Sequence, residues 1–392
     1  MSVLPEPGVI SFARGIPAAE MLPVGRLAEC SGRALAKHGR IALNYGPPEG
    51  FGALREWIAA QHAISPERVI VTPGSLVAMN MLVSHLVADR QHVVVEAPTY
   101  DRMLHLLDRA GADVLTLART AEGLDLDRLR ALLAGDCDPA FLYVLPTFHN
   151  PSGRTLVRGQ REQLAEIAIE HRLLVIEDDP YGLLRLSGEP QPTVHQLLRE
   201  RGADELAVYM SSFSKSVAPG LRVGYAVLPD TLVPAIAALA GSLYVSPPLL
   251  AQAELFEFLD AGFLDPQLER VRALLRPRRD ALVQVLGTGL PGGARLSAPD
   301  GGYFAWLDLP QGLDAATLQR RGREVGVSFV PGAGFFAGSG GTHNARLSFS
   351  YPGVDDIRVG AARLNALIAA SIGATANQTA GHLTPTHPGA RT

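Results

Sequence analysis

The segment Ser211–Gly224 reads Ser-Ser-Phe-Ser-Lys-Ser-Val-Ala-Pro-Gly-Leu-Arg-Val-Gly, and an unusual lysine stands near its centre. The chain contains two lysines, Lys37 and Lys215, so arginine supplies 33 of its 35 basic residues. A guanidinium stays protonated in proteins, whereas a lysine amine can lose its proton and act as a nucleophile. Lys37 lies among polar residues and is read as a surface lysine. Lys215 is therefore a candidate for Schiff-base chemistry with a carbonyl.

Hydroxyl groups and an arginine lie close to Lys215 in the sequence. Ser212 and Ser214 precede the lysine, a Pro-Gly turn follows it, and Arg222 comes seven residues later. Hydroxyls, turn backbone and the fork of an arginine are all suited to holding a phosphate group. The segment thus predicts a phosphate-holding loop with a nucleophilic lysine in it.

Ser-x-Ser-Lys followed by Gly-Leu-Arg-x-Gly resembles the pyridoxal-phosphate lysine segment of the fold-type I aminotransferases. The chain is most similar to the 2-aminoadipate, kynurenine and aromatic aminotransferases, which share their fold with the effector domain of MocR-type regulators. Several separated motifs follow the family's order between about residue 10 and about residue 370. The resemblance implies that Lys215 forms a Schiff base with pyridoxal 5'-phosphate, and that Ser212, Ser214 and Arg222 hold the phosphate.

Length and composition are those of an ordinary globular enzyme. The 392 residues suffice for one large and one smaller domain, and 47% are hydrophobic while 19% are charged. The net charge of −4, without a basic block, argues against a nucleic-acid surface. Cys30 and Cys137 are expected to be reduced thiols, because two cysteines build neither a disulfide framework nor a metal cluster. No apolar run reaches about 18 residues and the start lacks signal-peptide features, so we expect a cytoplasmic protein and no membrane partner.

Short apolar runs alternate with helical segments from about residue 68 to about residue 228. Near-continuous runs of this kind predict strands that are buried on both faces of a mainly parallel sheet in an α/β fold. Ligands of such folds bind in the loops beyond the strand ends. The seven predicted strands are Val69–Val71, Val93–Val95, Val114–Leu117, Phe141–Leu145, Leu173–Ile176, Leu206–Met210 and Val223–Val227.

The rest of the chain predicts a second, smaller α+β domain. A long Leu- and Arg-rich helix is expected at about 263–286, and strands near 303–309, 327–330 and 345–350 accompany helices near 315–323 and 354–370. The final residues are small, polar and rich in Pro and Gly, so we expect a disordered tail. The predicted divisions are an arm and helix (1–40), a large cofactor-binding domain (41–275), a small domain (276–370) and the tail (371–392).

The loop after the first predicted strand, Thr72-Pro73-Gly74-Ser75, begins a helix expected over about 75–87. Free N–H groups and the positive end of the helix dipole attract an anion there. Serine is also a common helix cap, which is the ordinary alternative. By resemblance, Gly74, Ser75 and Leu76 cup the cofactor phosphate. Many relatives have Gln where this chain has Leu76, so one polar contact is expected to be missing.

Three further loops match family motifs around the cofactor ring. Tyr100 of Ala-Pro-Thr-Tyr is implied to stack on the ring and to act in catalysis. The resemblance implies that Asn150 of Asn-Pro-Ser-Gly donates to the phenolic oxygen, which Tyr181 would also contact. It also implies that Asp178 of Glu-Asp-Asp-Pro-Tyr pairs with the protonated ring nitrogen and sustains the ring as an electron sink. The alternatives are a core tyrosine, an Asn-Pro turn and an acidic turn or metal site. His149 has no partner in view, so no metal is expected.

The substrate is implied to lie between the second domain and the N-terminal arm. Arg346, in the apolar strand Asn344–Phe349, matches the arginine that grips the substrate α-carboxylate, and a structural salt bridge is the alternative. The arm around Arg14 and Gly15 covers the active site, and Asn150 also contacts substrate. Arg14 replaces a small residue of many relatives. Tyr45 matches a tyrosine that reaches the phosphate of the other subunit, which implies a homodimer with shared active sites.

The resemblance implies an aminotransferase that moves an amino group between an L-amino acid and a 2-oxo acid through a Lys215 aldimine. A lyase, cyclase or oxidase with the same cofactor remains an alternative, because a fold does not settle the reaction. A ligand-sensing regulator is disfavoured, since the chain reaches the active-site arm by residue 10 without a DNA-binding module before it. The sequence does not specify which amino acid is the substrate.

Overall fold

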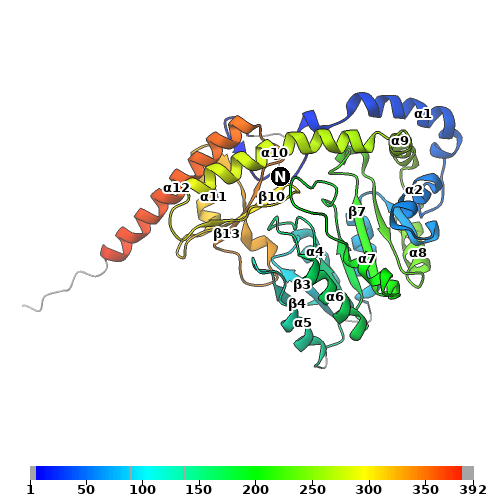
Figure 1. Cartoon of the computed structure of the whole chain (residues 1–392), viewed down its shortest axis with the longest axis horizontal. Coiled ribbons are helices and arrows are strands. Elements are labelled where there is room, and N and C mark those ends of the chain that lie inside the picture. The colour runs from blue at the N-terminus through cyan, green and yellow to red at the C-terminus, as the bar shows by residue number, and fades with distance from the viewer. Residues whose placement is uncertain (1–5, 89–90, 136, 382–392) are drawn as a thin grey trace, which may run out of the picture.

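Seven strands form one sheet in the computed structural model, which describes residues 6–88, 91–135 and 137–381 (Figure 1). The strand order is β2-β8-β7-β6-β5-β3-β4, and all strands run parallel except β8, which is antiparallel to β2 and β7. The predicted α/β fold with a mainly parallel seven-stranded sheet is confirmed. The bounds are β2 (Val69–Thr72), β3 (His92–Ala97), β4 (Asp113–Ala118), β5 (Leu142–Val144), β6 (Val175–Asp178), β7 (Ala207–Ser212) and β8 (Gly224–Val227).

Helices cover both faces of this sheet, which explains the near-continuous apolar strands. In β2, Ile70 packs among residues of α3 (Ser75–Leu86), α4 (Asp101–Ala110) and α8 (Val233–Tyr244). Its neighbours Val69 and Val71 point to the opposite face, towards α1 (Val24–Ala42), α2 (Gly52–His62) and α9 (Leu249–Asp260). That face is completed by α5 (Leu126–Leu133), α6 (Arg158–Glu170) and α7 (Val194–Glu200).

The strand β4 departs from the prediction that all seven strands are buried on both faces. Asp113, Thr116 and Ala118 are exposed, and of the six residues only Leu117 is buried. Edge position alone is not the reason, because β2 lies at the other edge and is fully buried where α2 and α3 contact it, whereas the main helix contact of β4 is with α5.

A second sheet of four antiparallel strands has the order β12-β13-β10-β9. The helix α10 (Leu264–Gly289) crosses from the large sheet to this one, and α12 (Val354–Gly381) packs along it (Figure 1). The predicted α+β character of this part agrees with these elements, whereas the predicted domain limits stay predictions. The bounds are β9 (Arg295–Leu296), β10 (Phe304–Asp308), α11 (Ala315–Glu324), β12 (Val330–Pro331) and β13 (Asn344–Ser348).

The tail predicted from residue 371 is wrong over its first part. The helix α12 continues to Gly381, and residues 382–392 lie outside the described residues. Leu367, Ile368 and Ser371 are buried, and Ser371 accepts a hydrogen bond of 2.7 Å from Nη1 of Arg321 in α11. Tertiary contacts therefore hold the helix at residue 371, where composition alone predicts the start of disorder.

The N-terminal arm joins the second sheet region rather than extending into solvent. The short strand β1 (Ile10–Ser11) pairs in parallel with β11 (Val327–Ser328). Phe12 is fully buried, and its backbone N–H donates to the Ser328 carbonyl at 2.7 Å. This pairing fixes the arm residues that follow.

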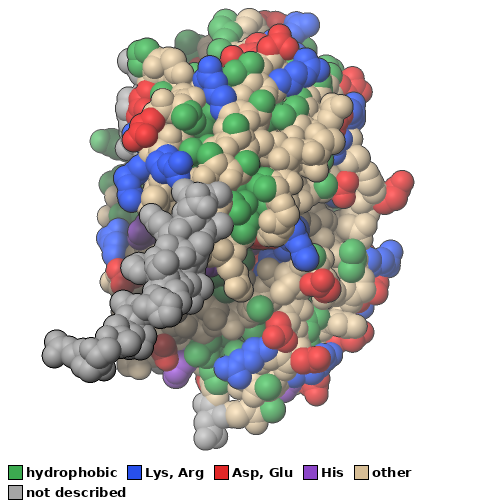
Figure 2. Space-filling view, turned by 90° about the vertical axis from the view of Figure 1, so that its left-hand side faces the viewer, with side chains coloured by type: hydrophobic (Ala, Val, Ile, Leu, Met, Phe, Trp, Pro, Cys, Tyr) green, Lys and Arg blue, Asp and Glu red, His purple; other side chains and the backbone are tan. Residues whose placement is uncertain are grey.

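The surface carries charges of both signs. On the face shown in Figure 2, Lys and Arg side chains are interspersed with Asp and Glu side chains. Within the described ranges, no helix combines the length and apolar character required to cross a membrane.

Candidate active site

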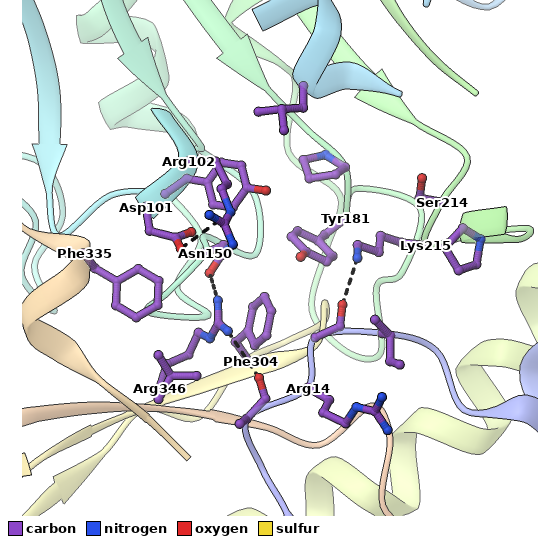
Figure 3. A pocket seen from close by; sticks show the side chains of 18 of the residues that line it. Arg14, Asp101, Arg102, Asn150, Tyr181, Ser214, Lys215, Phe304, Phe335 and Arg346 are labelled. Atoms are coloured by element: carbon purple, nitrogen blue, oxygen red, sulfur yellow. Dashed lines mark hydrogen bonds and ion pairs between the residues drawn. The ribbon is translucent and has the colours of Figure 1, made fainter. Parts of the chain in front are cut away.

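Loops beyond the carboxyl ends of the parallel strands line a cavity of about 690 Å³, at the place where α/β folds bind ligands (Figure 3). Residues from β10, β13 and the N-terminal arm close its other side. The cavity brings together these residues predicted from the sequence: Arg14, Gly15, Ser75, Leu76, Tyr100, Asn150, Asp178, Tyr181, Ser212, Ser214, Lys215, Arg222 and Arg346. Gly74 and Tyr45 are not among its lining residues.

Lys215 follows β7 and extends its amine into the cavity. Its Nζ donates a hydrogen bond of 2.8 Å to the Gly15 carbonyl of the arm. Burial lowers the pKa of Lys215 to about 8, and the positive charges of Arg346 and Arg222 act in the same direction. A substantial fraction of the amine is therefore neutral near physiological pH, which is the form a nucleophile or base requires.

Gly15 is required where the arm crosses this lysine. A Cβ placed on Gly15 would lie 2.5 Å from Cζ of Phe304, so a larger residue would push the arm away. The absence of a side chain lets the carbonyl of the arm approach Lys215. Contact between the arm and Lys215 therefore depends on a glycine at position 15.

Asp178 is the last residue of β6, and its two carboxylate oxygens differ in hydrogen bonding. Oδ2 accepts a hydrogen bond of 2.7 Å from the Tyr143 hydroxyl, whereas Oδ1 is buried and has no hydrogen-bond partner within the described part of the chain. Burial raises the pKa of Asp178 to about 7; the Tyr143 hydrogen bond opposes the rise and the charge of Asp179 adds to it. A buried carboxylate of this kind requires a cationic partner. The protonated ring nitrogen of pyridoxal phosphate fits this requirement.

The N-terminus of α3 and the loop after β7 meet at one end of the cavity. Ser212 Oγ donates to Ser214 Oγ at 2.8 Å, and the exposed Arg222 reaches over Gly74. Gly74 has φ of 88°, and a Cβ there would clash with Nη2 of Arg222. Hydroxyls, a guanidinium and free helix N–H groups make this end suitable for a phosphate.

Arg346 projects from β13 between two aromatic rings. Its guanidinium carbon lies 4.2 Å from the ring centre of Phe304 and 4.9 Å from that of Phe335. Nη1 donates to Asn150 Oδ1 at 2.9 Å, and Nη2 makes a longer bond of 3.4 Å to the Ala13 carbonyl. No acidic side chain of the described residues forms a salt bridge with this arginine. The guanidinium is therefore available to an external anion such as a carboxylate.

Two tyrosines flank the space between Lys215 and Arg346. Burial raises the pKa of Tyr100 to about 12, and the charge of Asp178 adds to the rise. Tyr181 is 3% exposed, and its ring packs 5.6 Å from that of Tyr303. Burial also raises the Tyr181 pKa well above its usual value. Both phenols are therefore protonated at neutral pH and can donate hydrogen bonds.

Two predicted residues lie differently from the rest. Tyr45 is 82% exposed and makes no contact with the cavity of its own chain. Arg14 lines the cavity, but its guanidinium lies over the Tyr351 ring at 4.7 Å and points away from Arg346 in Figure 3. This geometry does not place Arg14 against the group that Arg346 would bind.

The structure adds five residues that sequence reasoning missed: Asp101, Arg102, Tyr143, Phe304 and Phe335. Tyr143 could have been identified from the sequence, because a phenol within a buried strand requires a hydrogen-bond partner. Asp101 and Arg102 directly follow Tyr100, so proximity to a recognised motif pointed to them. Phe304 and Phe335 come from the second sheet region, and their sequence surroundings carried no comparable signal.

His149, which the sequence left without a function, is buried behind the Asn150 loop. Its Nε2 lies 3.2 Å from Glu96 Oε2, and Nδ1 lies 2.8 Å from Ser152 Oγ. Burial lowers the pKa of His149 to about 4, which outweighs the opposing charge of Glu96. Among the described residues there is no group of three or more His, Cys, Asp or Glu side chains that could hold a metal.

Comparisons with known proteins agree on one family. A family model described as "Aminotransferase class I and II" matches residues 7–364. The 2-aminoadipate transaminase of Thermus thermophilus is 37% identical over 359 residues, which cover 91% of this chain and 89% of that protein. The aromatic-amino-acid aminotransferase 1 of Thermococcus litoralis is 32% identical over 366 residues, covering 91% and 87%. The solved α-aminoadipate aminotransferase LysN of Thermus thermophilus, complexed with N-(5'-phosphopyridoxyl)-L-leucine, is similar with a TM-score of 0.89 at 35% identity, covering 94% of each chain.

Proposed function

The chain belongs to the class I and II aminotransferases, and we propose that Lys215 is the residue to which it attaches pyridoxal phosphate. The enzyme is a pyridoxal-phosphate-dependent aminotransferase, acting on amino acids and 2-oxo acids. One observation supports the proposal most directly. The Lys215 amine, with its lowered pKa, and the unpartnered Asp178 Oδ1 belong to the same cavity as the Arg346 guanidinium.

The donor set around the cavity suits each part of the cofactor. Asp178 would pair with the ring nitrogen, Tyr100 would pack on the ring, and Asn150 and Tyr181 would donate to the phenolic oxygen. The cofactor phosphate would lie against the following group: Gly74, Ser75, Leu76, Ser212, Ser214 and Arg222. When bound, pyridoxal phosphate supplies an electron-accepting ring that stabilises negative charge at the substrate Cα.

The chain's own residues supply binding and proton transfer. Arg346 presents a planar fork to the substrate α-carboxylate, and the flanking rings of Phe304 and Phe335 exclude water from that contact. Asn150 Oδ1 holds Nη1 of Arg346, which orients the fork. The neutral Lys215 Nζ takes the proton from the substrate Cα as a general base.

The arm contacts both Lys215 and Arg346. The Gly15 carbonyl accepts from Lys215, and the Ala13 carbonyl accepts from Arg346. An incoming α-carboxylate would replace the weaker of the two bonds, at 3.4 Å, with a charge-assisted pair. Substrate binding and a shift of the arm are thus coupled in this proposal.

We also propose that the enzyme is a homodimer with shared active sites, in which Tyr45 contacts the cofactor phosphate of the partner subunit. Three apolar side chains near Tyr45 are exposed in the single chain, namely Leu43, Leu243 and Val245. The two segments are held together, because the Gly46 backbone N–H donates to Ser246 Oγ at 3.0 Å. A second copy would bury this apolar surface. Light scattering after gel filtration tests the dimer.

Substrate class and location are further proposals. The names of the relatives point to two kinds of amino acid side chain, acidic and aromatic. A cytoplasmic location is favoured by Cys30 and Cys137, which are both free thiols. A lyase, cyclase or oxidase reaction would release a product other than the matching 2-oxo acid, so product analysis discriminates it from transamination.

The decisive experiment treats the purified holoenzyme with borohydride and maps the tryptic peptides by mass spectrometry. We expect a reduced pyridoxyl group on Lys215 alone, and none at that position in Lys215→Ala. Amino acids should convert the bound cofactor to its amino form and release the matching 2-oxo acid. A label on Lys37, or on neither lysine, would overturn the assignment of Lys215.

A further inference from the structure

Asp101 and Arg102 begin α4 directly after Tyr100, and both side chains line the cavity (Figure 3). Nε of Arg102 lies 3.9 Å from Asp101 Oδ2, which is a long and loose ion pair. The Arg102 side chain is 53% exposed and that of Asp101 is 29% exposed. Among the described residues, this pair is the only ionic contact recorded for Arg102. Its fork of N–H donors is thus held only loosely, by Asp101, at the edge of the site.

Helix stability does not account for Arg102. Positive charges are unfavourable in the first turn of a helix, because the macrodipole is positive there, and Arg102 is the second residue of α4. An exposed ion pair of this length offsets little of that cost. Arg109 lies in the last turn of the same helix, where the negative end of the macrodipole makes a positive charge favourable. Stabilisation of α4 therefore does not explain the arginine at position 102.

Arg102 shares the cavity with Arg346, the guanidinium proposed to hold the α-carboxylate. Figure 3 shows the Asp101–Arg102 pair and Arg346 on the same side of the cavity, with Asn150 between them and Lys215 across from them. Burial lowers the pKa of Arg346; the charge of Asp101 opposes this shift and the charge of Arg102 adds to it, so both members of the pair act on Arg346. Two neighbouring guanidinium groups in one cavity suit a ligand with two carboxylates.

We infer that Arg102 binds the side-chain carboxylate of a dicarboxylic amino acid or 2-oxo acid whose α-carboxylate is held by Arg346. This inference names the substrate class of the proposed function and rests on that function. It assigns the specificity to Arg102 rather than to Arg14, which is stacked on Tyr351 and turned away from Arg346.

Asp101 opposes the binding of a side-chain carboxylate at Arg102. Its carboxylate is the resident partner of Arg102, so a ligand carboxylate must displace it and is also repelled by it. A ligand with an uncharged side chain leaves the Asp101–Arg102 pair in place and packs instead near Phe304 and Phe335. Removing the Asp101 charge should therefore strengthen dicarboxylate binding and leave binding of uncharged side chains unchanged.

The test compares ligands that differ only by the terminal carboxylate. The reactive pair is L-2-aminoadipate and L-norleucine, and the unreactive pair is adipate and hexanoate. Rates of cofactor conversion give kcat/KM for the amino acids, and calorimetry with the holoenzyme gives dissociation constants for the acids. The variants are Arg102→Gln, Asp101→Asn and, as a matched control, Arg109→Gln, which removes an exposed arginine of the same helix outside the cavity.

For Arg102→Gln we expect kcat/KM for L-2-aminoadipate to fall roughly 10- to 100-fold and the adipate dissociation constant to rise in parallel, the range for losing one charged hydrogen-bonding partner. Values for L-norleucine and hexanoate should change less than about twofold. Asp101→Asn should bind adipate more tightly, and Arg109→Gln should match the wild type.

Two results would overturn the inference while leaving the aminotransferase assignment intact. One is a wild type that does not prefer adipate to hexanoate. The other is an Arg102→Gln variant that loses the same factor for both members of a pair. If no amino acid converts the cofactor, the proposed function fails, and the adipate and hexanoate measurements still decide whether Arg102 binds a carboxylate.

Discussion

The Tyr143 hydroxyl donates a hydrogen bond of 2.7 Å to Oδ2 of Asp178 between the neighbouring strands β5 and β6. Both residues are buried, so neither group exchanges this bond for water. The bond fixes the carboxylate with Oδ1 unpartnered at the cavity. Tyr143 thus orients the acid that is proposed to carry the positive charge of the cofactor ring.

Tyr143→Phe should weaken cofactor binding roughly 10- to 100-fold. The hydrogen bond lowers the Asp178 pKa, so its loss raises a pKa that burial already holds at about 7, and less of the acid is ionised at neutral pH. A bond to a charged group contributes about 1.5–3 kcal/mol, which sets the magnitude. Equilibrium titration of the apoenzyme with pyridoxal phosphate measures the change.

The matched control for this variant is Tyr209→Phe. Tyr209 donates a similar bond of 3.1 Å to Oδ2 of Asp179, the adjacent acid, which does not line the cavity. We expect Tyr209→Phe to lower the free energy of unfolding without changing cofactor affinity by more than about twofold. Equal losses of affinity in the two variants would contradict a specific role for Tyr143.

The rate at which pyridoxal phosphate attaches to the apoenzyme should rise with pH, and the midpoint of this rise should lie near pH 8. Burial lowers the Lys215 pKa to about 8, so the reactive neutral amine becomes the major form above that pH. Because the Arg346 charge also lowers this pKa, Arg346→Gln should move the midpoint to higher pH. Stopped-flow absorbance at several pH values measures both.

Arg109→Gln serves as the control for charge, since Arg109 is exposed and outside the cavity. Its midpoint should equal that of the wild type. A wild-type midpoint near 10.5, the ordinary lysine value, would contradict a buried and electrostatically perturbed amine.

Gly74→Ala should weaken cofactor binding and lower the free energy of unfolding by about 1–3 kcal/mol. The loss of stability follows from φ of 88°, and the loss of affinity follows from displacement of the Arg222 guanidinium by the new methyl group. Gly111→Ala separates the two effects, because Gly111 has φ of 69° but open space around its Cβ position. Of the two variants, only Gly74→Ala should change the dissociation constant of pyridoxal phosphate. An unchanged constant would contradict the proposal that Arg222 holds the cofactor phosphate.

Glu96→Gln should lower the free energy of unfolding by about 3–5 kcal/mol at pH 7, because it leaves the buried Arg119 without its ionic partner. Burial raises the pKa of Glu96, but the charges of Arg119 and His149 outweigh it and hold the pKa at about 2. A lowered carboxyl pKa stabilises the fold above its unfolded value of 4.5, and this contribution is lost as pH falls through 2. Urea denaturation should therefore show the two proteins converging below pH 4.5.

An exposed acid provides the comparison for Glu96. Glu162 pairs with Arg158 at 2.7 Å on the surface of α6, so Glu162→Gln should cost less than about 1 kcal/mol at any pH. If both variants lost a similar free energy of unfolding, burial would not make the Glu96–Arg119 pair more stabilising than an exposed pair.

Local sequence predicted the strands and loops of the large sheet well. Near-continuous apolar runs predict buried parallel strands, and the motifs around Lys215, Asp178 and Asn150 each follow such a strand. The prediction was wrong for β4 and for the start of the tail at residue 371. Burial of an edge strand depends on the helices that pack on it, since the edge strand β2 is fully buried and the edge strand β4 is not, and the helical conformation of α12 at residue 371 depends on contacts such as that of Ser371 with Arg321.

The sequence by itself determined the fold class and the family, and it predicted the residues proposed to hold pyridoxal phosphate, because these depend on residue type and spacing within short segments. The tertiary structure decided which groups face one another: Tyr143 with Asp178, the Gly15 carbonyl with Lys215, and Arg102 with Arg346 in one cavity. Gly15 and Lys215 are 200 residues apart in the chain. Only the folding of distant segments onto one sheet edge sets the distances on which a pKa or a carboxylate contact depends.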